Sequence, residues 1–360
     1  MLSALVNHFL STDADRHFAR TGLEEADFIY GGSGNRGTAG RVVKEAEDRG
    51  LGIANLTFDD IESEEDLHNI GEKIEGKKLF YRHKAFSNVD SVEEKIDLLD
   101  NLNVLEQEYN VELMNNPMTS LAHDSKTVGK RLIDENLSGD AARTPEQYSE
   151  SEAREKVRDR PVVLKPDEGS LGNGVTKAES VKEIDRYLQG KDEEEIVFEE
   201  YIPHDLDLSE RPDNLDEKFY EEILDEYGEN IVDGRAYIAD GEVVADTARE
   251  NDEGLATNLA KGGDYTEPEE LDEKQEEALA QAATGLDFAA VDYVQTDDEL
   301  IIYEVNATPE TDYEDEVGGL IDQVVDMLDP DKETEDLNEA TAEISPSPES
   351  NNGNQYSAAV

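Results

Sequence analysis

The stretch Val162–Val175, VVLKPDEGSLGNGV, decides how the rest of the chain is interpreted. An apolar run ends at Lys165, and glycines follow at Gly169, Gly172 and Gly174. Because glycine lacks a Cβ atom, such a loop can approach phosphate oxygens closely, and the lysine supplies a positive charge for them. The stretch therefore predicts a phosphate-binding loop in which Lys165 serves the ligand rather than core packing. An ordinary surface turn after a strand has a similar composition and stays open as an alternative.

A second polar group lies in two apolar runs, 290–295 and 300–305, which a Thr-Asp-Asp turn separates. The sequence predicts two adjacent antiparallel strands here. Because side chains alternate along a strand, Glu304 and Asn306 point to the same face, and Asp292 can lie opposite them. Three oxygen ligands suit a Mg²⁺ ion that bridges nucleotide phosphates. In so acidic a chain, however, carboxylates also come together by chance.

The composition is strongly acidic, with 91 Asp and Glu against 32 Lys and Arg in 360 residues, which gives a net charge of −59. Such carboxylates repel one another at low salt, whereas at molar salt the Debye length falls to about 3 Å and screens them. The composition resembles that of proteins from halophiles that accumulate salt. Apolar strand-like runs recur between the acidic stretches, which favours a folded protein over a disordered one. The charge disfavours binding to nucleic acid or to an anionic membrane.

The sequence contains no cysteine, which excludes disulfides and thiolate metal sites. Residues 1–8 lack the basic start and long apolar core of a signal peptide. No run approaches the roughly 18 apolar residues that a membrane helix needs. We therefore expect a soluble, cytoplasmic protein. The sequence leaves the oligomeric state open, and a homo-oligomer is compatible with it.

Three α/β blocks and a tail are expected, at residues 1–118, 119–198, 199–328 and 329–360. The tail is acidic and then rich in Ser, Pro and Asn, which predicts disorder. An acidic segment, 205–230, looks like a surface insertion.

The first block begins with a predicted strand at 27–30, a glycine turn, a helix at 41–49 and a strand at 51–56, which indicates a parallel βαβ unit. In the other blocks, helices are expected at 125–136, 181–188 and 272–283. Strands are expected at 162–164, 195–202, 235–239 and 242–245. The last two strands form a hairpin around Asp240-Gly241.

Two glycine-rich or basic features are weaker. Gly31–Gly37 fits the spacing G-x-G-x-x-G of a dinucleotide site but lacks the Gly-Lys-Ser/Thr ending of a P-loop, and a tight βα turn is favoured. The basic cluster at 77–84 contains Lys77, Lys78, Arg82, His83 and Lys84. It is interpreted as a solvated patch, with an anion-binding surface as the alternative.

Other cations are scarce, which draws attention to Arg235, Arg249 and Lys261. Arg249 follows a predicted strand, and a loop runs from Asn251 to Lys261. Each cation could hold a phosphate or carboxylate of a ligand, or serve as an ion-pair partner within the protein.

Further short motifs occur along the chain. They are Asn116-Pro117, Asp124-Ser125-Lys126-Thr127, Phe198-Glu199-Glu200-Tyr201-Ile202, Asp233-Gly234-Arg235, Thr257–Gly263, Gly285–Tyr293 and Glu304–Pro309. Together with the lysine and its glycine loop, their order and spacing over roughly residues 115–310 resemble the ATP-grasp superfamily. Within that superfamily, they resemble particularly the branch of RimK-like and glutathione-synthetase-like carboxylate–amine ligases. It implies an ATP-grasp fold of α+β lobes, in the α/β class, with an N-terminal pre-ATP-grasp domain and a disordered acidic tail.

The resemblance also implies roles for individual residues. Lys126 and Lys165 would contact ATP phosphates, and the backbone of the hinge Glu200–Ile202 would read adenine. Asp233 would hold the ribose, although Asp205 is an alternative. The full nucleotide-binding set would be Lys126, Lys165, Gly169, Ser170, Gly172, Gly174, Glu199, Glu200, Tyr201, Ile202, Asp233 and Arg235.

By the same resemblance, Asp292, Glu304 and Asn306 would hold one or two Mg²⁺ ions, which Mn²⁺ can replace. Arg249 would stabilise charge on an acylphosphate, with Asn258 and Lys261 near the γ-phosphate or the acceptor carboxylate. The expected reaction is ATP-dependent ligation of a small-molecule or peptide carboxylate to an amine, with release of ADP and phosphate.

A kinase that phosphorylates a hydroxyl and a non-catalytic nucleotide-binding scaffold are the alternatives. Residues 203–232 depart from the family pattern, because relatives usually have a shorter connection there. The N-terminal block matches no ligase specificity pattern.

Overall fold

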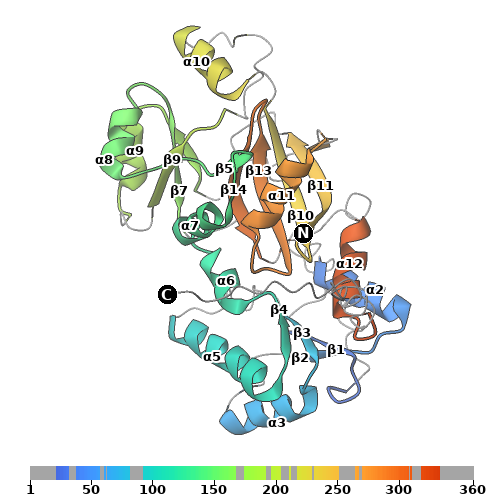
Figure 1. The fold of residues 1–360 in the computed structure, drawn as a ribbon. Coiled ribbons are helices and arrows are strands. Elements are labelled where there is room, and N and C mark those ends of the chain that lie inside the picture. Colours follow the sequence, from blue (N-terminus) through green and yellow to red (C-terminus); the bar gives the residue numbers. More distant parts are fainter. Residues whose placement is uncertain are drawn as a thin grey trace, which may run out of the picture.

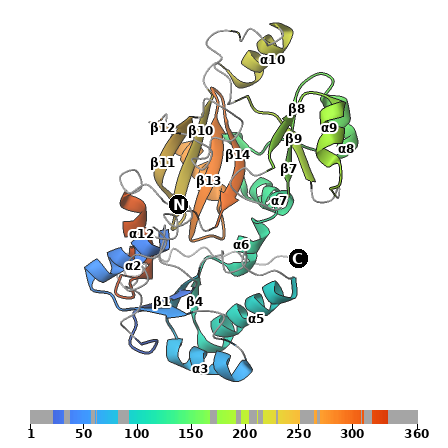
Figure 2. The same cartoon turned by 180° about the vertical axis from the view of Figure 1, so that it is seen from behind.

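A computed structural model describes residues 22–31, 38–56, 61, 63–81, 92–167, 174–191, 196–203, 211, 217–228, 231–250, 264–266, 270–307, 309 and 318–332. The described strands form three sheets, each in its own lobe (Figures 1 and 2). None of the described helices is long and apolar enough to cross a membrane. The predicted tail, apart from its first residues, lies outside the described residues.

The N-terminal lobe is a four-stranded parallel sheet with the order β2-β1-β3-β4. Its strands are β1 (Phe28–Gly31), β2 (Ile53–Leu56), β3 (Lys78–Tyr81) and β4 (Glu112–Met114). Its helices are α2 (Thr38–Arg49), α3 (Glu64–Ile74) and α5 (Val92–Tyr109). The predicted βαβ unit is confirmed, because β1 and β2 pair in parallel on either side of α2. All four residues of β1 are buried, as expected of a strand in a parallel sheet covered on both faces.

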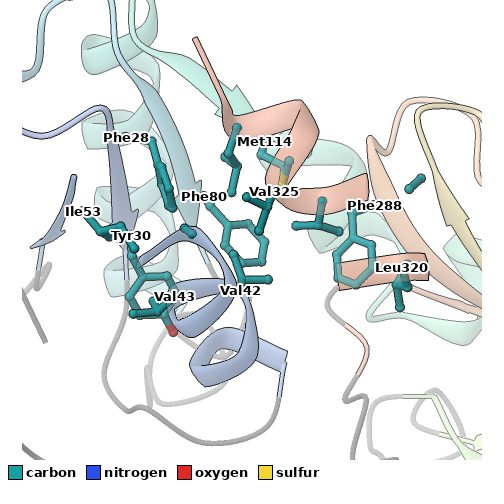
Figure 3. Packing of buried hydrophobic residues seen from close by; sticks show 14 of the residues in the cluster. Phe28, Tyr30, Val42, Val43, Ile53, Phe80, Met114, Phe288, Leu320 and Val325 are labelled. Atoms are coloured by element: carbon teal, nitrogen blue, oxygen red, sulfur yellow. The ribbon is translucent and has the colours of Figure 1, made fainter. Parts of the chain in front are cut away.

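One core joins the N-terminal lobe to the C-terminal part of the chain (Figure 3). Phe80 of β3 and Phe288 of the C-terminal sheet meet edge to face, with ring centroids 6.4 Å apart. The helix α12 (Gly318–Leu328), which the sequence had not predicted, packs its buried Leu320 and Val325 into this core. Arg49 of α2 reinforces the contact through a 2.5 Å ion pair with Asp322. The N-terminal lobe is therefore fixed against the C-terminal lobe rather than tethered to it.

The central lobe contains an antiparallel sheet with the order β6-β9-β7-β8. Its strands are β6 (Gln147–Tyr148), β7 (Val162–Pro166), β8 (Thr176–Ala178) and β9 (Ile196–Glu200). The helices α8 (Glu150–Lys156) and α9 (Val181–Leu188) bury Ala153 and Ile184 against this sheet. A capping box between Ser149 and Glu152 starts α8. Two helices lead into this lobe, α6 (Pro117–Ala122) and α7 (Lys126–Asn136).

The C-terminal lobe is a six-stranded sheet with the order β12-β11-β10-β13-β14-β5. Its strands are β5 (Ala142–Arg143), β10 (Val232–Ala239), β11 (Glu242–Glu250), β12 (Asp264–Thr266), β13 (Phe288–Gln295) and β14 (Leu300–Asn306). The helix α11 (Glu273–Ala282) buries Leu279 in the core of this lobe. The predicted hairpin is confirmed, because Asp240 and Gly241 have φ angles of 51° and 75°, as a type I′ turn requires.

The expected surface insertion, 205–230, is more than a solvated loop. It contains the helix α10 (Glu217–Tyr227), whose Ile223 and Tyr227 are buried against Ile202, Val294 and Ile301. The acidic composition had concealed this apolar face, which repeats at i and i+4. The helix α10 is therefore part of the core beside β13 and β14.

Candidate functional site

The three residues expected to bind a metal are brought together by β13 and β14. Asp292 lies directly opposite Glu304 in the strand register, and a β-bulge follows at Asp292 and Tyr293. The Asn306 Nδ2 atom donates a hydrogen bond of 3.0 Å to Asp292 Oδ2. Asp292, Glu304 and Asn306 thus form one polar group at this edge of the two strands.

Arg235 occupies the other side of Asp292. The two residues are direct partners on β10 and β13, and the guanidinium binds both carboxylate oxygens at 2.6 and 2.7 Å. The sequence left open whether this arginine binds a ligand or forms an ion pair, and in the structure it forms the ion pair. Such a bidentate contact fixes the orientation of the Asp292 carboxylate.

Charged side chains from several elements act on the carboxyl group of Glu304. Burial raises the pKa of its carboxyl group, and the charge of Asp292 raises it further. The charges of Lys126, Lys165 and Arg235 oppose this shift. Cations from α7, β7 and β10 therefore act on the carboxylates of β13 and β14.

This group of side chains fits a magnesium ion in the chemistry of its donors. Two carboxylates and an amide provide oxygen ligands, and a cation would relieve the repulsion that disfavours ionised Glu304. Across the described ranges, no three His, Asp or Glu side chains form a group that could hold a metal ion by themselves. Asn306 and ligand oxygens such as those of nucleotide phosphates would have to complete the coordination.

Lys165 has a structural role that the sequence did not suggest. Its Nζ atom lies 2.6 Å from Glu199 Oε2 on the neighbouring strand β9, and the two side chains are only 9% and 5% exposed. The phosphate contact of Lys165 stays a prediction, and the ion pair adds a role in packing that the sequence analysis had not expected. Its charge also neutralises a buried carboxylate, which could not otherwise stay ionised at low cost.

The two ends of the glycine-rich loop are firmly anchored, although residues 168–173 lie outside the described part of the chain. At the start, Asp167 accepts hydrogen bonds from Ser125 Oγ at 2.7 Å and from the Thr127 amide at 2.8 Å. Burial opposes ionisation of Asp167, but these bonds outweigh it and hold its pKa below the usual value. At the end, the carbonyl of Gly174 accepts a 2.6 Å hydrogen bond from the Tyr187 hydroxyl.

Gly174 is required at its position for two reasons. Its φ angle is +82°, in the left-handed region that favours glycine. A Cβ atom there would also lie 2.9 Å from Pro166 Cγ. The loop therefore leaves β7 and returns beside it at a fixed point.

Lys126 stands at the first residue of α7, beside the start of this loop. Its Nζ atom lies 3.2 Å from the Asp167 carbonyl oxygen, and Ser125 caps the helix. The positive end of the α7 dipole adds to the lysine charge here. The arrangement is suited to an anion.

The predicted hinge, Glu200–Ile202, is buried at the end of β9. Glu199 and Glu200 point to opposite faces of the strand, so Glu199 meets Lys165 whereas Glu200 meets Arg143. Burial would raise the pKa of Glu200, but hydrogen bonds from Arg143, the Glu146 amide and Tyr227 lower it below its usual value.

Asp233, the expected ribose ligand, is also buried, and its charge helps to raise the pKa of the nearby Tyr303, for which burial is the larger cause. Its alternative, Asp205, lies outside the described residues. The backbone of Arg249 pairs with Asp233 across β10 and β11, but the Arg249 side chain is not among those described. The other expected site residues outside the described ranges are Gly169, Ser170, Gly172, Asn258 and Lys261.

The structure describes only part of the two N-terminal motifs, the basic cluster 77–84 and the glycine-rich stretch 31–37. Of the basic cluster, Lys78 Nζ donates a 2.6 Å hydrogen bond to the Met327 carbonyl oxygen and so helps to hold α12. Lys77 donates to backbone carbonyls of Glu24 and Ala26. Residues 82–84 and most of the loop 31–37 lie outside the described ranges.

Asn115 is a site-positioning residue that the sequence analysis missed. It is buried with a φ angle of 69°, and its side-chain amide binds the carbonyl oxygens of Phe288 and Ala307. Its Oδ1 atom accepts a hydrogen bond from the Phe288 amide at 2.8 Å. Asn115 therefore ties the N-terminal lobe to the chain immediately after Asn306. Only its place beside the Asn116-Pro117 motif could have drawn attention to it.

Comparison with known proteins agrees with this architecture. Residues 215–328, which contain Asp292, Glu304 and Asn306, match the RimK-like ATP-grasp domain. This part of the chain is therefore similar to a RimK-like ATP-grasp domain. The matched residues start in the insertion, at α10, and end with α12.

A curated protein similar to this chain is tetrahydromethanopterin:alpha-L-glutamate ligase of Methanocaldococcus jannaschii. The two are 29% identical over 148 residues, which is 41% of this chain and 45% of that protein. The match therefore spans a little under half of the length of the relative.

Solved ATP-grasp ligases share the fold over most of the chain. The ligase PsnB, complexed with a phosphomimetic variant of its minimal precursor, Mg and ADP, aligns with a TM-score of 0.58 and 15% identity, over 85% of this chain and 98% of that one. D-alanine–D-alanine ligase from Bacillus anthracis with ATP gives a TM-score of 0.53 and 15% identity, over 88% and 98%. The macrocyclase MdnC from Microcystis aeruginosa, bound to its precursor peptide, gives 0.53 and 13%, over 84% and 98%. At such identities the similarity establishes the ATP-grasp fold, which confirms the fold expected from the sequence.

Proposed function

We propose that this protein is an ATP-dependent ligase that joins a carboxylate to an amine through an acylphosphate and releases ADP and phosphate. The observation that carries the proposal is the convergence of charges on Glu304. The charges of Lys126, at the start of α7, and of Lys165, on β7, act on it, and Asp292 lies opposite it in the C-terminal sheet. A triphosphate with a divalent cation would satisfy both sets of charges.

In the proposed reaction, an oxygen of the substrate carboxylate attacks the γ-phosphorus of ATP. The bond from that phosphorus to the β,γ-bridging oxygen breaks, and ADP leaves. The amine nitrogen then attacks the acyl carbon, the bond from that carbon to the phosphate oxygen breaks, and phosphate leaves as the nitrogen loses a proton to solvent. The protein contributes positioning and charge neutralisation rather than covalent chemistry.

Each site residue has a definite task in this scheme. Lys126 and Lys165 neutralise phosphate charge, and the backbone of Glu200–Ile202 reads adenine. Mg²⁺, in one or two sites on Asp292, Glu304 and Asn306, supplies further charge neutralisation when it is bound, and Mn²⁺ is expected to replace it.

Three residues whose side chains lie outside the described part would serve the acyl group. Arg249 is proposed to stabilise the charge of the acylphosphate and of its tetrahedral successor. Asn258 and Lys261 are proposed to lie near the γ-phosphate or the acceptor carboxylate.

The relatives suggest which substrates to test first. One is a glutamate ligase by name, one joins D-alanine, and two were solved with precursor peptides. We therefore propose an amino acid or peptide as a substrate of this protein. L-Glutamate is the first amine to offer.

A screen for ADP release over amino acids, small diacids and peptides, in molar KCl with Mg²⁺, tests the function. A ligase releases one free phosphate for each ADP when both substrates are present. A kinase, the main alternative, forms ADP but leaves the phosphate on the product. A non-catalytic scaffold forms neither ADP nor free phosphate with any substrate pair, and this result would contradict the proposal.

A further inference from the structure

We propose that Tyr227, carried by the insertion, is a positioning residue that holds the adenine-binding hinge in place through Glu200. The inference rests on the proposed ATP-binding function of the hinge. It gives the insertion between β9 and β10 a role in nucleotide recognition. The insertion is visible as α10 at the end of the molecule beyond the C-terminal sheet in Figure 1.

The contact between Tyr227 and Glu200 is short and buried. The Tyr227 hydroxyl donates a hydrogen bond of 2.6 Å to Glu200 Oε1. The remaining oxygen, Oε2, accepts from Arg143 at 2.7 Å and from the Glu146 amide at 2.9 Å. A carboxylate held from three directions cannot rotate without breaking a charge-assisted hydrogen bond. Glu200 therefore fixes the backbone from which the hinge continues.

The same carboxylate is connected to the C-terminal lobe by two routes. Arg143 binds Glu299 in the turn between β13 and β14 at 2.7 Å, as well as binding Glu200. Tyr227 reaches the same turn through its backbone carbonyl, which accepts a 3.4 Å hydrogen bond from the Asp297 amide. Through Glu200, the hinge between the central and C-terminal lobes is thus held against the turn between β13 and β14.

The position of α10 itself is well determined. Ile223 and the Tyr227 ring are buried with Ile202 of the hinge. Just after the helix, Gly228 has a φ angle of +82°, and a Cβ atom there would lie 1.9 Å from Asp297 Oδ2. The turn between β13 and β14 therefore packs directly against the end of α10. The insertion cannot shift without moving the hydroxyl of Tyr227.

The position of Glu200 matters because the hinge is proposed to recognise adenine through its backbone groups. Backbone amide and carbonyl groups have no rotamers to adjust, so they recognise a ring only if the chain is placed to within about 0.5 Å. A change in the bracing of Glu200 should therefore weaken nucleotide binding. It should weaken ADP binding more than GDP binding, because guanine does not match the same pattern of donors and acceptors.

The test is Tyr227→Phe, which removes one hydroxyl and keeps the ring in its apolar contacts. Binding of ADP and GDP with Mg²⁺ is measured by calorimetry in molar KCl. We expect ADP affinity to fall about 3- to 10-fold. This is the effect of losing one hydrogen bond to a charged group when only part of its free energy appears as weaker ADP binding. The ratio of GDP to ADP dissociation constants should fall with it.

Tyr293→Phe is the matched control. Tyr293 is also buried, and its hydroxyl donates to a carboxylate, that of Asp246, at 2.8 Å, but its ring belongs to a different apolar cluster from the hinge residue Ile202. This variant should lose stability yet keep its ADP affinity within about twofold, since its loss is confined to packing of the sheet.

Glu200→Gln is a second variant that keeps the shape of the side chain but removes its charge, and it should also weaken ADP binding. Wild-type ADP affinity in both Tyr227→Phe and Glu200→Gln would overturn the inference. A wild-type protein that binds no ADP would instead contradict the proposed function, so the two failures are distinguishable.

Discussion

At the scale of single residues, Lys165 combines two roles that one experiment can separate. Lys165→Ala leaves Glu199 as a buried charge without its ion pair, which should cost about 3–5 kcal/mol in the free energy of unfolding. The double variant Lys165→Met with Glu199→Gln removes both charges and should recover most of that loss. ATP turnover should be lost in both variants, because neither has the phosphate charge.

Denaturant unfolding and ADP release, both in molar KCl, measure the two effects. Turnover at the wild-type rate by the stable double variant would show that Lys165 serves only to neutralise Glu199.

The metal assignment makes a separate prediction at Glu304. Glu304→Gln removes one anionic ligand, so the Mg²⁺ concentration needed for half-maximal turnover should rise at least about tenfold, or turnover should vanish. Glu242→Gln removes the same charge from an exposed position on β11 and serves as the control. Equal Mg²⁺ titrations for the two variants would mean that Glu304 is not a ligand.

At the scale of elements, the junction of α6 and α7 should be sensitive to acid through His123. This histidine is buried, neither ring nitrogen has a hydrogen-bond partner within the described residues, and Gly129 of α7 packs beside its ring. Burial lowers the pKa of His123 from 6.5 to about 4, partly opposed by Asp124. Between these two values the unfolded chain binds more protons than the folded one, so stability falls as pH falls.

The expected loss from His123 is about 2 kcal/mol between pH 7 and about pH 5. His123→Phe lacks the titrating group and should therefore show a shallower acid limb in unfolding experiments at molar KCl. Parallel pH profiles for the two proteins would mean that His123 is accessible to protons in the folded state.

The elements also show how far the sequence can be read. Elements with clear periodicity and recognisable ends were predicted within a few residues, such as α9, α11 and the hairpin at Asp240-Gly241. The helices α10 and α12 were not predicted, because acidic residues interrupt their apolar stripes. The buried face of each helix can be recognised only once the surface that it packs against is known.

The site was predictable where it follows strand alternation, as for Glu304 and Asn306. Contacts between distant segments were not predictable. Arg235 with Asp292, Lys165 with Glu199, and Tyr227 with Glu200 all depend on strand order or on packing of the insertion.

At the scale of the whole molecule, the net charge of −59 should make the fold depend on salt. Circular dichroism should show a folded protein in molar KCl and loss of structure at low ionic strength, where carboxylate repulsion is no longer screened. KCl and NaCl should act alike if screening is the cause. Equal stability at both extremes would show that the ion pairs within the fold already balance the repulsion.

The most direct test of the proposed chemistry follows an oxygen atom. With a substrate carboxylate labelled with ¹⁸O, attack on the γ-phosphate and later displacement by the amine transfer one labelled oxygen to the released phosphate. Mass spectrometry of that phosphate, after turnover in molar KCl with Mg²⁺ and a productive substrate pair, should therefore show one ¹⁸O atom for each amide bond formed. Free phosphate without the label, or label retained in a phosphorylated product, would contradict ligation through an acylphosphate.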